Sequence, residues 1–185
     1  MKKSNFTIEF LGHAGMAFNI DGQIFLMDPW FSKNGAFASS WFQLPKNHYY
    51  NEITFKNLQG IFLSHEHLDH YDPDYLSTLN ADIPIYIPSF PSENFYVKIK
   101  NDLKRRPKFL NGKKIHSINE MEIKILFEDS PMNQDSVWVI KVGSTSIVNT
   151  IDSRLNEQQV YEILEFIGGK PDALTMQFSG ASWYP

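Results

Sequence analysis

The chain has 185 residues, a size typical of one globular domain, and 42% of them are hydrophobic, which excludes a disordered or collagen-like chain. Its formal net charge of −4 gives no overall attraction to nucleic acid or to an anionic membrane. The absence of cysteine from these residues excludes disulfides, thiolate metal ligands and cysteine nucleophiles.

The N-terminal residues carry no signal-like apolar region, and no stretch of 18 apolar residues occurs in the sequence. We therefore expect a cytoplasmic protein that acts on a small molecule, with neither nucleic acid nor a membrane as partner.

The first part of the chain alternates apolar and polar residues, which predicts two early antiparallel strands, one within residues 6–20 and one over 23–28. The next segment, 28–42, is rich in aromatic residues, glycine and serine and has no clear period. It is expected to form an ordered loop, whose aromatic side chains either stack on a base or sugar or cover the core.

A continuous apolar run at 60–64 predicts a strand that is buried on both faces. Asp72 and Pro73 then predict the cap and first position of a short helix. Further strands are expected at 83–87, 121–127, 137–142, 146–150 and 173–178, and further helices at 92–103 and from Asn156 to Gly168. This order favours an α/β sandwich of sheets covered by helices over a doubly wound sheet.

Four residues with metal-binding side chains follow the strand at 60–64, in the pattern H-x-H-x-D-H: His65, His67, Asp69 and His70. Side chains two residues apart on a strand point the same way, so His65 and His67 can hold one ion, and the turn that follows can bring Asp69 and His70 to a second. Imidazole and carboxylate ligands suit zinc, iron, manganese or nickel, and the ligand types alone do not rank these metals. Such an ion activates water or keeps open positions for oxygen chemistry, and Asp69 is the candidate catalytic residue.

This pattern at the end of a strand resembles that of the metallo-β-lactamase superfamily. The resemblance implies an αβ/βα sandwich with two adjacent metal sites at one edge. It extends along nearly the whole chain, so we expect residues 1–185 to form one metallo-β-lactamase-like domain. The final histidine of the fold would lie beyond Pro185, so the fold is expected to be incomplete at its C-terminus, as the N-terminal part of a longer chain.

Shorter blocks are similar to the metallo-β-lactamase-like module of CMP-N-acetylneuraminate hydroxylases and UDP-sugar hydroxylases: Asp28 to Phe31, Gly35 to Phe37 with Trp41, Ile61 to His65, Asp82 to Tyr86, Asn149 to Asp152 and Gly180 to Ser182. By this resemblance Asp152 bridges the two metal positions, and the alternative is a carboxylate that caps the following helix. Where the family has a third histidine for the first metal, this sequence has Pro131, which cannot bind a metal; Asp129, Asn133 or Asp135 are the possible substitutes.

Two residues outside the motif are secondary candidates. Asp28 follows a predicted strand, and its carboxylate suits an acceptor for the ring N–H of a metal-bound histidine, although a plain turn residue is equally consistent. His13 lies in a glycine-flanked turn, and we expect it to be structural and not a ligand. Eight basic residues between 98 and 114 form either an anion-binding region or a solvated helix face.

The leading functional prediction is a metal-dependent hydrolase domain in which one or two ions, zinc first and iron or manganese next, activate water on an anionic sugar-phosphate or nucleotide-sugar substrate. The first alternative is the oxygen-activating module of a nucleotide-sugar hydroxylase, which would need a Rieske or other electron-transfer partner because these residues include no cysteine. The second alternative is a non-catalytic domain that binds a metal or a partner.

Overall fold

The computed structural model describes residues 5–52, 55–129 and 134–177. The chain divides into two compact units, Met1–Asn111 and Gly112–Pro185, each built around its own sheet. Each unit is described by itself below. Within the described residues, no helix is both long and apolar enough to cross a membrane.

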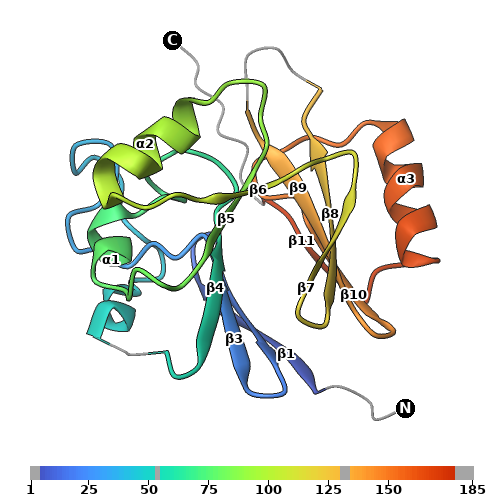
Figure 1. Ribbon diagram of the computed structural model, residues 1–185, viewed down its shortest axis with the longest axis horizontal. Helices are drawn as coiled ribbons and strands as arrows, with labels where there is room; N and C mark the ends of the chain where they lie inside the picture. Colours follow the sequence, from blue (N-terminus) through green and yellow to red (C-terminus); the bar gives the residue numbers. More distant parts are fainter. Residues whose placement is uncertain (1–4, 53–54, 130–133, 178–185) are drawn as a thin grey trace. The chain divides into compact units, whose positions relative to one another are not determined.

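The sheet of the first unit runs in the order β1-β2-β3-β4-β5-β6 (Figure 1). The strands β1, β2 and β3 are antiparallel, and β3 to β6 are parallel to one another. The strands are β1 (Phe6–Gly12), β2 (Gly15–Ile20), β3 (Gln23–Met27), β4 (Leu58–Phe62), β5 (Ile85–Pro88) and β6 (Lys108–Leu110). Because β4 lies between two parallel neighbours, its last residues are buried, as the continuous apolar run predicts.

Two helices, α1 (Pro73–Ser77) and α2 (Asn94–Leu103), pack on this sheet, and a short 3-10 helix η1 (His48–Glu52) precedes β4. The Asp72 carboxylate accepts the Tyr75 N–H and so caps α1, with Pro73 as its first residue, in agreement with the prediction. The core beneath both helices is aliphatic and aromatic: Leu26, Phe31, Ile61, Leu63, Tyr75, Leu76, Ile85, Ile87, Phe95 and Ile99.

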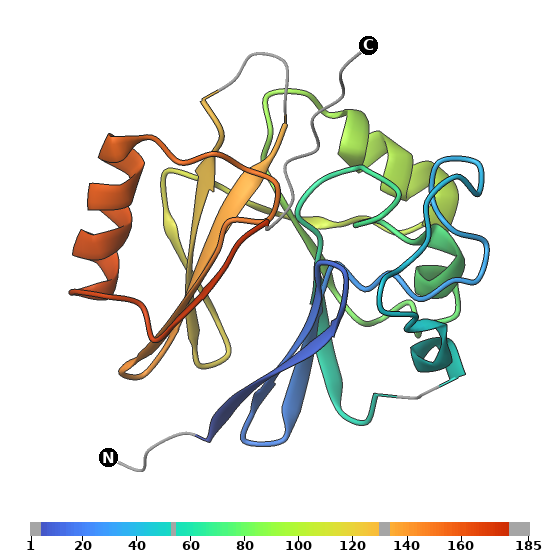
Figure 2. The same ribbon diagram turned by 180° about the vertical axis from the view of Figure 1, so that it is seen from behind.

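The second unit is a meander of antiparallel strands, β7 (Ile115–Ile118), β8 (Met121–Phe127), β9 (Ser136–Val142) and β10 (Thr145–Asn149), with β11 (Ala173–Thr175) parallel to β10. The helix α3 (Glu157–Ile167) packs on this sheet through Ile163 (Figure 2). Asn156 and Gln159 form a capping box at its start, and Gly168 ends it in the left-handed conformation, both as predicted.

The strand prediction is wrong in three places. Residues 6–20 form two strands because the chain reverses at His13, whose φ of 53° breaks the extended run. The short strands β6 and β7 have too few apolar residues for their alternation to be recognised. The last strand ends at Thr175, and Phe178 lies outside the described residues.

Candidate metal centre

The histidine motif occupies a tight turn that begins at His65, three residues after the end of β4. The N–H groups of His70 and Tyr71 both donate to the carbonyl of His67, at 3.0 and 2.8 Å. This turn gathers the imidazoles: the ring centroid of His65 lies 4.4 Å from that of His67 and 4.2 Å from that of His70. His65 Nε2 and His67 Nδ1 are 2.8 Å apart. The four predicted residues of the first unit are thus brought together at the C-terminal end of β4.

The carboxylate of Asp28, directly after β3, holds this cluster in place through hydrogen bonds to Ser64 and His70. It is fully buried and accepts three hydrogen bonds: from the Ser64 N–H at 2.8 Å, the Ser64 hydroxyl at 2.6 Å and the His70 Nδ1–H at 3.0 Å. Because the Ser64 hydroxyl donates to Asp28, it accepts from His65 Nδ1, at 2.9 Å. Both buried imidazoles therefore carry their proton on Nδ1 and present the lone pair of Nε2.

Asp28 thus accepts the ring N–H of a histidine, His70, as expected, and the role of His70 as a metal ligand stays a prediction. Asp28 adopts a φ of 43°, a left-handed conformation that Asp tolerates better than most residues. The chain turns here, and the backbone N–H of Asp28 donates to the carbonyl of Phe62 on β4. This hydrogen bond fixes the end of β3 against the start of the histidine turn.

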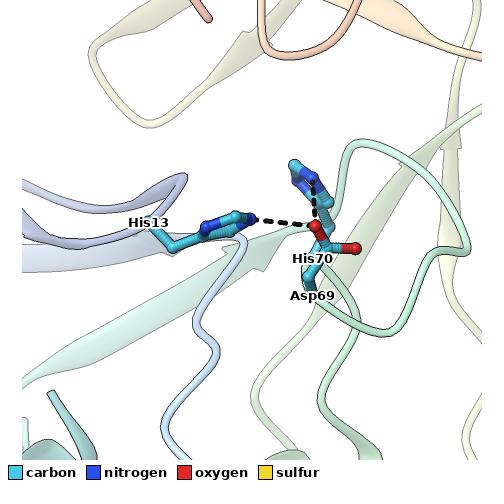
Figure 3. A group of neighbouring side chains, drawn as sticks. All are labelled: His13, Asp69 and His70. Carbon is cyan, nitrogen blue, oxygen red and sulfur yellow. Dashed lines mark hydrogen bonds and ion pairs between the residues drawn. The ribbon is translucent and has the colours of Figure 1, made fainter. Parts of the chain in front are cut away.

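A second group is formed by His13, Asp69 and His70 (Figure 3). His13, in the turn between β1 and β2, places Nε2 2.9 Å from Asp69 Oδ2, and His70 Nε2 lies 3.6 Å from the same oxygen. One ligand atom from each of these three residues lies within 4.8 Å of the other two. His13 therefore belongs to the metal-binding candidates, contrary to the expectation of a purely structural turn residue.

Burial and the neighbouring histidines keep the imidazole of His65 uncharged. Removal of the ring from water lowers its pKa well below the ordinary value, and the nearby charges of His70, His67 and His13 lower it further. For Asp69, burial acts to raise the pKa of the carboxyl, but the hydrogen bond from His13 and the charge of His70 outweigh it, so the pKa is lowered. The cluster thus combines a neutral imidazole, that of His65, with an ionised carboxylate, that of Asp69.

These residues fit a divalent metal ion. Neutral imidazole nitrogen and carboxylate oxygen are the ligands that zinc, iron and manganese share. Asp69 Oδ1 is buried and has no hydrogen-bond partner in another residue of the described part of the chain. A buried carboxylate oxygen without a partner is costly in a protein interior, and coordination or a bound water molecule would satisfy it.

The other predicted residues lie in the second unit or outside the described ranges. Asp152 follows β10 in a turn and is half-buried, and its role as a metal ligand stays a prediction. Asp135 is buried directly before β9, and Asp129 is exposed after β8. Pro131 and Asn133 lie outside the described residues, as do Gly180 to Ser182.

The basic stretch of the first unit lies away from the histidines. Lys104, Arg105, Arg106 and Lys108 line a cavity of about 320 Å³ together with residues 81–85. Residues 81–85 lie at the start of β5 and residues 104–108 at the start of β6, whereas the histidine turn follows the end of β4. These three strands are parallel to one another. The cavity is therefore at the opposite edge of the sheet, and these four cations do not supply the charge that would hold a substrate at the histidine cluster.

The comparison with known protein families gives a match over residues 7–160 to the model described as a beta-lactamase superfamily domain. The chain belongs to the β-lactamase superfamily. The matched range contains the whole H-x-H-x-D-H motif, and the resemblance to metallo-β-lactamase-fold proteins is confirmed.

Among curated proteins, the chain is 27% identical over 190 residues to a Mycobacterium tuberculosis protein that carries the name of a Rieske 2Fe-2S iron-sulfur protein. The alignment covers 95% of this chain and 34% of that protein. A relative from Mycolicibacterium smegmatis with the same kind of name is also 27% identical, with the same coverage. The chain therefore spans about a third of the length of the curated relatives that it matches.

Among solved structures, the diiron β-hydroxylase CmlA from Streptomyces venezuelae superposes with a TM-score of 0.65 at 17% identity, covering 94% of this chain and 34% of CmlA. An isothiocyanate hydrolase from Delia radicum gut bacteria superposes with a TM-score of 0.65 at 15% identity, covering 90% of this chain and 69% of that chain. These likenesses confirm the metallo-β-lactamase-like αβ/βα fold class. The fold implies a divalent metal, and it is shared by an isothiocyanate hydrolase and by a diiron β-hydroxylase.

Proposed function

We propose that the chain is the metal-binding catalytic domain of a hydrolase that acts on an anionic small molecule, a sugar phosphate or nucleotide sugar. His65, His67, Asp69, His70 and Asp152 would hold one or two divalent ions, with zinc as the first candidate. The observation that carries the proposal is the buried, ionised carboxylate of Asp69, which lies beside the imidazoles of His13 and His70. Its Oδ1 atom has no hydrogen-bond partner in another described residue.

The side chains of this cluster have separate tasks in such a reaction. A bound divalent ion would lower the pKa of a water molecule toward neutrality. Asp69 Oδ2 lies between His13 and His70, which leaves Oδ1 to accept the proton that the attacking water loses. Asp28 and Ser64 keep the Nε2 atoms of His70 and His65 deprotonated and fixed in direction.

A second candidate function is the oxygen-activating module of a Rieske-coupled hydroxylase. It is favoured by the names of the curated relatives, which align with 95% of this chain. A Rieske cluster needs two cysteines, and these 185 residues contain none. In this alternative the cluster belongs to a partner or to another segment, and iron takes the place of zinc.

The metal content tests both candidates. The protein is purified without a histidine tag and without added metal, and its metals are measured by elemental mass spectrometry beside the variant His65→Ala/His67→Ala. The control is His48→Ala, which removes a histidine of η1 that lies outside the cluster. One or two equivalents of zinc that disappear only in the double variant support the hydrolase, and iron with the same dependence supports the hydroxylase module. No metal, even after titration with both ions, contradicts both and favours the non-catalytic binding domain.

The role of Asp69 is tested on the loaded protein. Asp69→Asn keeps the size of the side chain but cannot accept a proton, so we expect hydrolysis of a lactone, thioester or phosphodiester substrate to fall by about 10²–10⁴-fold. The metal content of this variant is measured in the same preparation. An unchanged rate at unchanged metal content would show that Asp69 is not the proton acceptor.

A further inference from the structure

The segment of residues 30–47, here called the aromatic segment, separates its aromatic side chains into two sets. Trp30 and Phe31 are buried in the first unit, at 1% and 0% exposure. Phe37, Trp41 and Phe42 remain 40%, 39% and 54% exposed, and Phe37 and Trp41 are the pair of these that lies next to histidine rings. The expectation that this segment covers the core therefore describes the first set only, and the exposed pair needs another explanation.

The exposed pair lies against the candidate metal centre. The ring centroid of Phe37 is 6.3 Å from that of His67, and the ring centroid of Trp41 is 6.3 Å from that of His13. The two aromatic rings are 6.0 Å apart, with an angle of 44° between their planes. They form a continuous apolar surface that adjoins the histidine cluster.

The backbone that presents these rings is strained. Three consecutive residues, Phe37, Ala38 and Ser39, have φ values of 52°, 56° and 63°. The left-handed conformation costs roughly 1–2 kcal/mol for each residue with a side chain. Strain of this kind persists where the surrounding structure holds it, and it is concentrated at binding and active sites.

Hydrogen bonds hold the strained turn closed. Ala36 and Trp41 exchange backbone hydrogen bonds of 2.8 and 3.2 Å on either side of it. The Ser39 hydroxyl donates to the Asn34 carbonyl and the Ser40 hydroxyl to the Phe37 carbonyl, both at 2.7 Å. A Cβ at position 35 would approach the Trp41 carbonyl oxygen to 2.6 Å, so only glycine fits there. The platform is therefore preorganised in the free protein.

We propose that Phe37 and Trp41 form a stacking platform for a sugar or base ring of an anionic substrate whose reacting group lies at the histidine cluster. Exposed aromatic faces bind the apolar faces of sugar rings and nucleobases, and the contact of this pair with His67 and His13 makes the platform continuous with the reaction site. This inference rests on the proposed function, because it assigns to the same site a ring-bearing substrate.

Isothermal titration calorimetry of the metal-containing protein tests the platform with three probes: inorganic phosphate, ribose 5-phosphate and adenosine 5′-monophosphate. We expect a ring-bearing probe to bind more tightly than inorganic phosphate, and Phe37→Ala/Trp41→Ala to remove about 10-fold or more of that affinity. A preference for adenosine monophosphate assigns the platform to a base, and equal affinity for the two ring-bearing probes assigns it to a sugar. The variant Trp41→Phe, which keeps an aromatic face, should retain most of the binding.

The control is Phe10→Ala, which removes an aromatic side chain of β1 that is 60% exposed. The platform is wrong if ring-bearing probes bind no more tightly than inorganic phosphate, or if the double variant binds like the wild type. The metal content of every variant is measured in parallel. If the wild type holds no metal, the proposed function fails by itself, while ring-dependent binding that still requires Phe37 and Trp41 keeps the platform.

Discussion

The histidine motif has three buried members, His65, Asp69 and His70, and one exposed member, His67, although all four are only a few residues apart. His65 and His70 are 2% and 1% exposed, and their Nδ1 atoms are held through Asp28 and Ser64. His67 is exposed, and its ring neighbours include His65 and the platform residue Phe37. Substitution of the buried members should therefore affect both the stability of the fold and metal binding. Substitution of the exposed His67 should affect metal binding with little effect on stability.

The largest expected effect comes from Asp28, which holds the buried His70 directly and the buried His65 through Ser64. Asp28→Asn keeps the size of the side chain and tolerates the left-handed backbone, but its amide cannot accept all three hydrogen bonds. Leaving buried donors unsatisfied should lower the free energy of unfolding by about 3 kcal/mol, measured by urea denaturation. Metal affinity should fall about 10–100-fold. Asp74→Asn, which alters one exposed hydrogen bond with Asn34, is the control and should change neither quantity.

The second-largest expected effect is on the pH dependence of stability, which should distinguish the buried His65 from the exposed His67. The pKa of His65 is lowered in the folded, metal-free protein, whereas the unfolded chain takes up a proton below about pH 6.5. Folding stability should therefore fall as the pH decreases through and below 6.5, by up to about 1.4 kcal/mol per pH unit. His65→Gln should flatten this decline, and His67→Gln should keep it. Equal slopes in both variants would show that burial of His65 is not the cause.

A smaller effect is expected from the relay between Asp28 and His65. Ser64→Ala removes the hydroxyl that donates to Asp28 and accepts from His65 Nδ1. The net loss in the free energy of unfolding should be about 1 kcal/mol, measured by urea denaturation. Metal affinity should fall about 10-fold because His65 loses its fixed tautomer. A loss of stability at unchanged metal affinity would limit Ser64 to packing.

The smallest expected effect concerns the contact between His13 and Asp69. His13→Asn suits the left-handed backbone at this position but is too short to keep the hydrogen bond from Nε2. The pKa of Asp69, which His13 lowers, should then rise toward its ordinary value. As the pH is lowered, the metal affinity of the variant should therefore begin to fall at a higher pH than that of the wild type. An unchanged profile would mean that His13 does not act through Asp69.

Local sequence patterns predicted those parts of the fold and the site that depend on neighbouring residues. The capped helix α3 and the buried strand β4 were recognised from spacing, and the motif at the end of β4 identified the four clustered residues. His13 was underestimated because its partner Asp69 is 56 residues away. A sequence signal for His13 was its position in a predicted turn, between Gly12 and Gly15.

The distance between the basic stretch and the metal centre could not be predicted from the sequence either. It follows from the parallel pairing of β4, β5 and β6, which sends the start of β5 and the end of β4 to opposite edges. A run of cations shows only that positive charge is concentrated, and strand direction decides where that charge lies.

The aromatic segment closes on itself at its base. Asn47 donates to the carbonyls of Trp30 and Leu11, and Gln43 donates to the carbonyls of Trp30 and Ser32. The two ends of the segment are therefore pinned together, and what lies between them can change in length and composition at little entropic expense. We therefore expect that replacement of this loop would remove the proposed platform while the histidine turn and its anchors stay intact.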